Sequence, residues 1–378
     1  MLYLFLFSLL IQIFFAWWYR YRPAVHAPLA ADALPGVSIL ICGKNEAEHF
    51  LRFLPYVLDQ SYAGAWEVLV VNDGSTDDSA AVLSALQQDF PLLRVLTIDP
   101  ATEKTFPGKK YALWQGLKQC TYDLVLLTDA DCMPAGKDWL HHMAATYQAA
   151  KLQTPQQSYF VLGYGAYEQK PGLLNAFIRW ETVHTFMQYT SWARAGYPYM
   201  GVGRNLMYER TPVLQALDQD DNFTALFRRT ASGDDDLIVS YLALSQQAVI
   251  VDHPEAKTIS AVKETWADWW KQKTRHVSSG KYYAERVKHG LAAYAFSGLL
   301  FWASAIALLQ AGNQKIQIIV LILLLLRIGI YSILNRKWCH ALDEKGRKAF
   351  SPLGDLMWVG YNIILTPYIF FKNKQQWK

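Results

Sequence analysis

Residues 37–46, VSILICGKNE, begin as a run of apolar and β-branched side chains and then turn polar. The same change recurs in WEVLVVND at residues 66–73 and in YDLVLLTDAD at residues 122–131. Short apolar runs of this kind are typical of strands buried on both faces. Segments with a helical pattern separate them: Glu46–Leu58, Ser79–Gln88 and Tyr111–Lys118. The alternation predicts an α/β domain with a mainly parallel sheet, to which Tyr159–Leu162 would add a fourth strand.

Both ends of the chain are apolar. Residues 1–18 read MLYLFLFSLLIQIFFAWW, without the basic start and small cleavage-site residues of a signal peptide, which predicts a retained anchor over residues 1–20. The anchor is short for a span, so an interfacial helix remains an alternative. Leu291–Leu309 and Ile316–Leu334 are each long enough to cross a membrane, whereas Leu353–Phe371 either crosses it or lies in the interface.

Basic residues near these segments predict their orientation. Arg20 and Arg22 follow the first segment, and a loop predicted at Asn335–Phe350 is rich in Arg and Lys, which favours the cytoplasm for both. Arg327 lies inside the second span, close enough to its end for the side chain to snorkel towards the interface. We therefore predict a multi-pass protein of the cell membrane whose central domain is cytoplasmic.

Composition excludes several classes of function. The 378 residues are 52% hydrophobic and only 18% charged, and the apolar excess lies at the two ends, which is typical of a membrane protein with one large domain. A net charge of +4 argues against a nucleic-acid partner. The four cysteines form no CxxC pair, so neither a disulfide framework nor a structural zinc site is expected.

Carboxylates follow two of the predicted strands. Asp73 opens the turn NDGSTDDS, whose Ser, Thr and Asp side chains could simply cap the next helix, but a carboxylate at a strand end could also bind a base or ribose. Asp129 and Asp131 follow the third strand, and two adjacent carboxylates need compensation by a cation. Hard oxygen ligands suit Mg²⁺ or Mn²⁺, although two solvated turn residues are the alternative.

A third acidic motif lies far downstream. Asp234, Asp235 and Asp236 form a run that enters a helical segment. Acidic residues stabilise the N-terminus of a helix through its dipole, so capping is the simplest interpretation. Three in a row exceed what a cap needs, and one of them could act as a general base towards an acceptor hydroxyl.

Three motifs, taken in order, resemble those of family 2 glycosyltransferases: residues 37–46, the NDGSTD loop at 72–77 and the DAD triplet at 129–131. The membrane-bound branch, which includes cellulose-, chitin- and hyaluronan-synthase-like enzymes and ceramide glucosyltransferases, adds an acidic motif and a Gln-x-x-Arg-Trp element. GDDD at 233–236 and QKTRH at 272–276 are similar to these. The resemblance covers about residues 37–283 and the flanking membrane segments.

The resemblance implies an A-type glycosyltransferase domain, Rossmann-like, between N- and C-terminal transmembrane helices. The implied segments are an anchor at 1–20, a cytosolic catalytic domain at 35–265, an amphipathic interface segment at 266–288 and membrane helices at 289–372. The nucleoside of a nucleotide sugar, of the uridine type, would lie against Glu46 and Asp73. Cys42 and Lys44 would line the same wall.

The remaining donor contacts also follow from the resemblance. Lys109 or Lys110 would approach the diphosphate, Asp129 would contact the ribose or the donor sugar and share the metal site, and Asp131 would bind Mg²⁺ or Mn²⁺ directly. A metal ion that bridges the diphosphate would stabilise it as a leaving group.

The resemblance further implies an inverting displacement. Asp235 is the predicted base, with Asp234 as the alternative because the acidic run aligns in two registers. Gln272 and Arg275 would lie beside the leaving diphosphate, and Gly203-Arg204-Asn205 is similar to the family's acceptor loop. The acceptor would be a lipid, a lipid-linked group or a glycan, because the site is next to the membrane.

Two departures argue against processive polymer synthesis: His276 replaces the usual Trp, and the C-terminal membrane portion is short. Two rival interpretations stay open. One is a non-catalytic membrane scaffold that keeps the fold, which intact acids at all three motifs disfavour. The other is a sugar-phosphate nucleotidyltransferase, for which the N-terminal region shows no Gly-rich phosphate loop.

Overall fold

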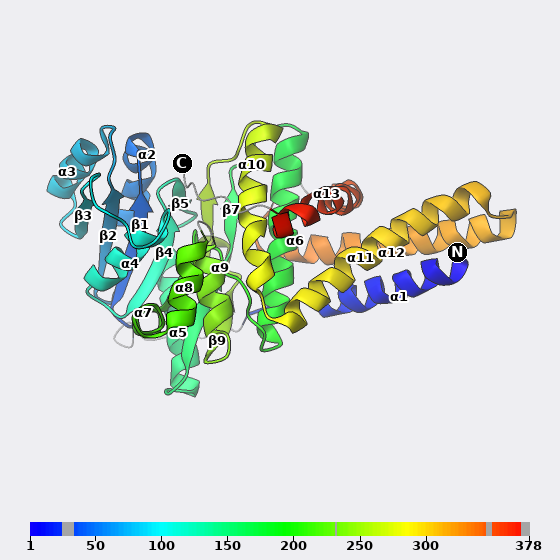
Figure 1. Cartoon of the computed structure of the whole chain (residues 1–378), viewed down its shortest axis with the longest axis horizontal. Coiled ribbons are helices and arrows are strands. Elements are labelled where there is room, and N and C mark those ends of the chain that lie inside the picture. The colour runs from blue at the N-terminus through cyan, green and yellow to red at the C-terminus, as the bar shows by residue number, and fades with distance from the viewer. Residues whose placement is uncertain (25–33, 231–232, 345–349, 372–378) are drawn as a thin grey trace. The chain divides into compact units, whose positions relative to one another are not determined.

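The computed structural model describes residues 1–24, 34–230, 233–344 and 350–371 (Figure 1). The chain divides into two compact units. The sheet unit comprises residues 24–168 and 193–263, and the helical unit comprises residues 1–23, 169–192 and 264–371. The helical unit interrupts the sheet unit at residues 169–192, and the boundary between catalytic and interface segments at residue 265 stays a prediction.

The sheet unit is built on a seven-stranded sheet in the order β3-β2-β1-β4-β8-β6-β9. Its strands are β1 (Val37–Gly43), β2 (Trp66–Asp73), β3 (Leu93–Ile98), β4 (Leu124–Asp129), β6 (Ser158–Gly163), β8 (Leu206–Glu209) and β9 (Gln246–Val251). All neighbours are parallel except β8, which pairs antiparallel with both β4 and β6. The predicted mainly parallel sheet is confirmed, and β3, β8 and β9 were not expected.

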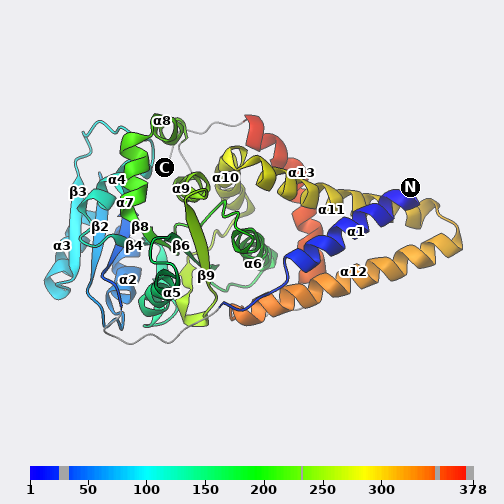
Figure 2. The same ribbon diagram turned by 90° about the horizontal axis from the view of Figure 1, so that it is seen from below.

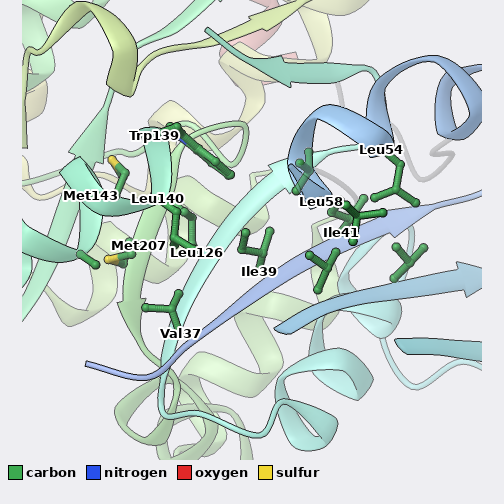
Figure 3. Packing of buried hydrophobic residues seen from close by; sticks show 14 of the residues in the cluster. Val37, Ile39, Ile41, Leu54, Leu58, Leu126, Trp139, Leu140, Met143 and Met207 are labelled. Atoms are coloured by element: carbon green, nitrogen blue, oxygen red, sulfur yellow. The ribbon is translucent and has the colours of Figure 1, made fainter. Parts of the chain in front are cut away.

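Helices cover both faces of this sheet (Figure 2). They are α2 (Ala47–Leu58), α3 (Ser79–Asp89), α4 (Lys110–Gln119), α5 (Trp139–Gln153), α7 (Arg210–Gln219), α8 (Asp221–Arg229) and α9 (Asp234–Leu242). Ile39 and Ile41 of β1 join Leu54 of α2 and Leu140 of α5 in one buried cluster (Figure 3). Leu40, which lies between Ile39 and Ile41 in β1, points to the other face of the sheet, where Gly116 lets α4 approach closely.

A small second sheet, in the order β5-β10-β7, follows the main one. It contains β5 (Cys132–Pro134), β7 (Gly165–Tyr167) and β10 (Thr258–Ser260). β5 comes directly after β4, so the chain turns at residues 130–131 between the two sheets. That turn carries the predicted metal ligand Asp131.

The helical unit contains α1 (Leu2–Trp18), α6 (Leu173–Arg194), α10 (Trp266–His276), α11 (Glu285–Ala311), α12 (Gln314–Ala341) and α13 (Ser351–Phe371). Among the described residues, α11 and α12 are long and apolar enough to cross a membrane, and α1 is a shorter apolar helix. Side chains of α1, α11 and α12 share a hydrophobic cluster that includes Phe5, Phe301 and Val320.

The structure corrects the interpretation of Arg327. Its side chain does not snorkel: it is 1% exposed, and Nη1 lies 2.7 Å from Oδ2 of Asp355 on α13. Nη2 donates to the side-chain oxygen of Gln12 on α1, at 2.5 Å. A buried ion pair with a satisfied partner is the usual way to place a charge inside a helical bundle.

The loop predicted at Asn335–Phe350 is also partly wrong, because α12 continues to Ala341. An apolar span followed directly by helix-forming residues has no signal that would stop the helix at the membrane surface. Three of the basic residues on which the orientation was argued, Lys345, Arg347 and Lys348, lie outside the described residues.

Candidate functional site

The predicted site residues gather at one edge of the main sheet. β1, β2 and β4 are adjacent and parallel, and they end at Gly43, Asp73 and Asp129. Cys42 lies directly beside Asp129 in the register of β1 and β4. Because the carboxyl ends of parallel strands meet at one edge, polar residues that are far apart in sequence converge there.

Asp73 is fully buried and has a partner that the sequence analysis missed. Its Oδ1 lies 2.6 Å from Nζ of Lys104, in the loop between β3 and α4. Its Oδ2, together with Oδ1 of Asn72, is buried without a hydrogen-bond partner among the residues that the structure describes. Lys104 also lines a pocket with Arg228 and Arg229. A carboxylate with one unused buried oxygen, next to a cationic pocket, suits a polar ligand.

The turn after β2 does more than cap the helix that follows it. Its Ser75 and Asp77 side chains accept hydrogen bonds from the backbone N–H groups of Asn45 and Ala47, at the start of α2. The expected capping of the following helix is therefore only part of its role. Glu46, at the N-terminal end of α2, places Oε2 2.5 Å from Nδ1 of His49. The two loops at this edge are thus tied together.

Asp129, Asp131 and Cys132 form a group of side chains whose ligand atoms all lie within 4.8 Å of one another. Burial and the charge of Asp129 raise the pKa of Asp131, which the Arg204 guanidinium partly offsets. The two carboxylates fit a hard divalent cation. Cys132 was not among the predicted ligands, and its Sγ lies 2.9 Å from Oγ of Ser260.

The two adjacent lysines before α4 have different surroundings. Lys109 forms an ion pair with Asp129. Burial lowers the pKa of Lys109, but the charges of Asp129 and Asp234 outweigh it and raise the pKa above its usual range. Lys110 instead directs its ammonium group to Phe227 and Thr230 and is fully buried. Of the two, Lys109 is the one that lies beside the carboxylates.

The acidic run begins α9, and Gly233 in front of it has the positive φ of 74° that glycine tolerates best. Oδ2 of Asp235 accepts a 2.6 Å hydrogen bond from the backbone N–H of Gly203, and Oδ1 accepts one from Asp236. Burial and the charge of Asp234 raise the pKa of Asp235 to about 6, despite these two hydrogen bonds. A carboxylate poised near neutral pH suits a general base.

In the predicted acceptor loop, Gly203 contacts the acidic run through the hydrogen bond from its backbone N–H to Asp235. Arg204 donates to the carbonyl oxygen of Gly165 and to Ser260 Oγ, both at 3.0 Å. Asn205 is fully buried and accepts from Trp139. These two side chains therefore hold the small sheet and α5 together.

The remaining predicted residues belong to the helical unit. Gln272 and Arg275 lie on α10, and Lys273 between them pairs with the buried Glu181 of α6. The side chain of His276 lies outside the described residues. The role of Gln272 and Arg275 beside a diphosphate stays a prediction, as does that of Lys44 beside the nucleoside.

Residues 38–205 match the sequence profile described as "Glycosyl transferase family 2". The chain is 26% identical over 254 residues to the "Probable glycosyltransferase YdaM" of Bacillus subtilis, covering 66% of this chain and 56% of that protein. It is 29% identical over 136 residues to the "Beta-monoglucosyldiacylglycerol synthase" of Nostoc, covering 36% and 28%. The chain thus matches little more than half the length of the first relative and less than a third of the second.

A solved structure shares the fold over nearly the whole chain. The mannosyltransferase PcManGT from Pyrobaculum calidifontis, in complex with GDP-Man and Mn²⁺, aligns with a TM-score of 0.54 over 96% of this chain and 98% of its own. The sequence identity is 16%, so the likeness concerns the fold.

Proposed function

Because residues 38–205 place this chain in glycosyl transferase family 2, we propose that it transfers a sugar from a nucleotide-sugar donor to an acceptor hydroxyl, with inversion at the anomeric carbon. The observation that carries the proposal is the convergence of two acidic motifs, far apart in the sequence, on one lysine. Asp129 pairs with Lys109, and the charge of Asp234, more than 100 positions along the chain, raises the pKa of Lys109. A turn or a helix cap needs no such convergence.

The nucleoside would bind at Asp73. Its unused Oδ2 can accept a hydrogen bond from a ring N–H, and the ammonium group of Lys104 on Oδ1 can donate to a carbonyl oxygen beside that N–H. Uracil and guanine present this N–H and C=O pair, whereas adenine and cytosine present the reverse pattern. Uridine is our choice, in line with the family resemblance. Cys42, Lys44 and Glu46 would line the same wall.

The diphosphate would lie over Asp129, Asp131 and Lys109. A divalent cation held by Asp131, and shared with Asp129, would supply charge neutralisation to the leaving diphosphate. The mannosyltransferase with the same fold is solved with Mn²⁺, which supports this class of metal. Lys109 adds a fixed positive charge at the same place. Gln272 and Arg275 would complete the contacts to the leaving group.

Asp235 would take the proton from the acceptor hydroxyl as that oxygen attacks the anomeric carbon. The hydrogen bonds from Gly203 and Asp236 orient its carboxylate, and the raised pKa gives it basicity near neutral pH. Attack opposite the leaving diphosphate converts an α-linked donor into a β-linked product. Asp234 remains the alternative base.

The acceptor would be a lipid, a lipid-linked group or a glycan at the cytosolic face of the cell membrane. Two helices of the helical unit are long and apolar enough to cross a bilayer. On α10, Trp266 is 44% exposed, as expected of a side chain at the headgroup level. The diacylglycerol named in one relative supports a lipid acceptor.

One experiment separates this function from its rivals. The purified protein is incubated with Mn²⁺ and a panel of nucleotide sugars, with and without membrane lipid extract, and release of nucleoside diphosphate is measured against the Asp235→Asn variant. We expect lipid-dependent release from one donor, and the variant should be inactive. A scaffold would release nothing from any donor. A nucleotidyltransferase would instead form pyrophosphate from a nucleoside triphosphate and a sugar phosphate.

A further inference from the structure

Lys110 is a fully buried lysine whose three donors are all used. Its Nζ lies 2.7 Å from the carbonyl oxygen of Thr230, 2.5 Å from Oγ1 of Thr230 and 3.2 Å from the carbonyl oxygen of Phe227. The ammonium group also lies 4.4 Å from the centre of the Phe227 ring. A buried ammonium is costly unless every proton has an acceptor, and here each has one.

The acceptors belong to the C-terminal end of α8. The last carbonyl oxygens of a helix have no partner within it and carry the negative end of the helix dipole. Lys110, at the first position of α4, therefore fastens the start of one helix to the end of another, 117 positions away in the chain.

α8 in turn is joined to α9, the helix that begins with the acidic run. The rings of Phe223 on α8 and Tyr241 on α9 are stacked with their centres 4.3 Å apart. The Tyr241 hydroxyl donates to Asp220, the residue that caps the N-terminus of α8. The two helices thus share contacts at more than one point, and a displacement of α8 would be transmitted to α9.

The neighbour in sequence, Lys109, holds the other side of the site through its ion pair with Asp129. Two consecutive residues therefore reach the predicted metal-binding carboxylate and the helix pair that carries the predicted base. Because a peptide unit has fixed dimensions, the spacing between these two anchor points changes little while both contacts are intact.

We propose that Lys110 is a positioning residue that holds α8 and α9, and with them the carboxylate of Asp235, at a fixed distance from Asp129 and Asp131. The proposal rests on the function proposed above for Asp235. Burial lowers the pKa of Lys110 to about 8, and the charges of Asp234 and Asp235 oppose this shift. The ammonium form that donates all three hydrogen bonds is thus maintained at neutral pH in part by the acidic run it positions.

The test replaces Lys110 by Met, which keeps the length of the side chain and removes its donors. The matched control is Lys118→Met on the same helix, an exposed lysine whose ammonium group lies over the ring of Trp114. We expect Lys110→Met to lower kcat by about 10- to 100-fold, as a misplaced catalytic group does. The Kd of the nucleotide donor should change less than about twofold, and Lys118→Met should change neither.

Hydrogen exchange measured by mass spectrometry gives a readout that is independent of activity. In Lys110→Met, amides of α8 and the first turn of α9 should exchange faster, whereas those of β1 and β4 should not. Thr230→Val removes only Oγ1 and should show the same changes to a smaller degree, which serves if the methionine variant does not fold. Lys110→Arg, which restores donors, should recover part of kcat.

Unchanged kcat in Lys110→Met, or parallel losses of kcat and donor affinity, would overturn the positioning role. Unchanged exchange of α8 and α9 would overturn it as well. If the wild-type protein transfers no sugar to any acceptor, the proposed function fails, while the exchange experiment still shows whether Lys110 holds these helices.

Discussion

The pH dependence of sugar transfer is the sharpest test of Asp235 as the base. Burial and the charge of Asp234 raise its pKa from 3.8 to about 6. A raised pKa keeps the carboxyl group protonated, and hence inactive as a base, up to a higher pH. Mass action leaves about half of the sites ionised at pH 6 and roughly one-tenth at pH 5, so kcat should fall about fivefold from pH 6 to pH 5 and about tenfold for each unit below pH 5.

The assay measures kcat from pH 4.5 to 8.5 with donor, acceptor and metal all saturating. Asp235→Asn should lower kcat by roughly 10²–10⁴-fold and remove the acid limb of the profile. Asp234→Asn should remain active, and its acid limb should move to lower pH because a like charge has been removed. The direction in which the acid limb moves in Asp234→Asn reports which acid titrates, in addition to the rate that each variant retains.

The same pKa shift predicts a change in stability. Since the folded-state pKa is raised, the folded protein binds more protons than the unfolded chain between pH 4 and pH 6, and ionisation of Asp235 costs stability above pH 6. Asp235→Asn should therefore raise the melting temperature above that of the wild type, and this difference should be larger at pH 8 than at pH 5. An acid limb centred near pH 4 in the wild type, or an active Asp235→Asn beside an inactive Asp234→Asn, would refute the assignment.

Three further predictions concern the metal, the topology and the helical unit. Asp131→Asn should abolish turnover and metal-dependent donor binding with the fold intact, and full activity in excess chelator would contradict this. A cysteine at position 313 should react with an impermeant reagent in intact cells, whereas one at position 78 should react only after lysis. Arg327→Leu leaves Asp355 buried without its cation and should destabilise the protein by about 3–5 kcal/mol, whereas the double variant with Asp355→Leu should be nearly neutral in a thermal melt.

The strands that position the site could be predicted because they are buried on both faces. β1, β2, β4 and β6 read as largely apolar runs, and the strand predicted at Tyr159–Leu162 differs from β6 by one residue at either end. β3, at the edge of the sheet, has fully buried side chains only at its two ends, and β8 has only four residues. Neither gives a signal as strong as that of a buried parallel strand.

The contacts between distant residues could not be predicted. Lys104 reaches Asp73 across 31 positions, and Lys110 reaches Thr230 across 120. No pattern in the sequence around either lysine indicates its acceptor, because the acceptor is brought near only by the fold. Arg327 shows the same limit: taken alone, a charge in an apolar run suggests snorkelling, and its partner Asp355 lies on a segment whose own position the sequence left open.

The balance of charge at the sheet edge gives a reason for the metal and a last prediction. Among the described residues, the carboxylates of Asp129, Asp131, Asp234 and Asp235 interact with three cations, Lys109, Lys110 and Arg204, which leaves one negative charge in a partly buried place. Burial first, and then the neighbouring negative charge, raises the pKa values of Asp131 and Asp235. A divalent cation would supply the missing charge, so Mn²⁺ and protons should compete. The Kd for Mn²⁺, measured by calorimetry without donor, should rise as the pH falls from 7 to 5, and it should rise less in Asp234→Asn. A Kd that is independent of pH over this range would show that the carboxylates do not hold the metal.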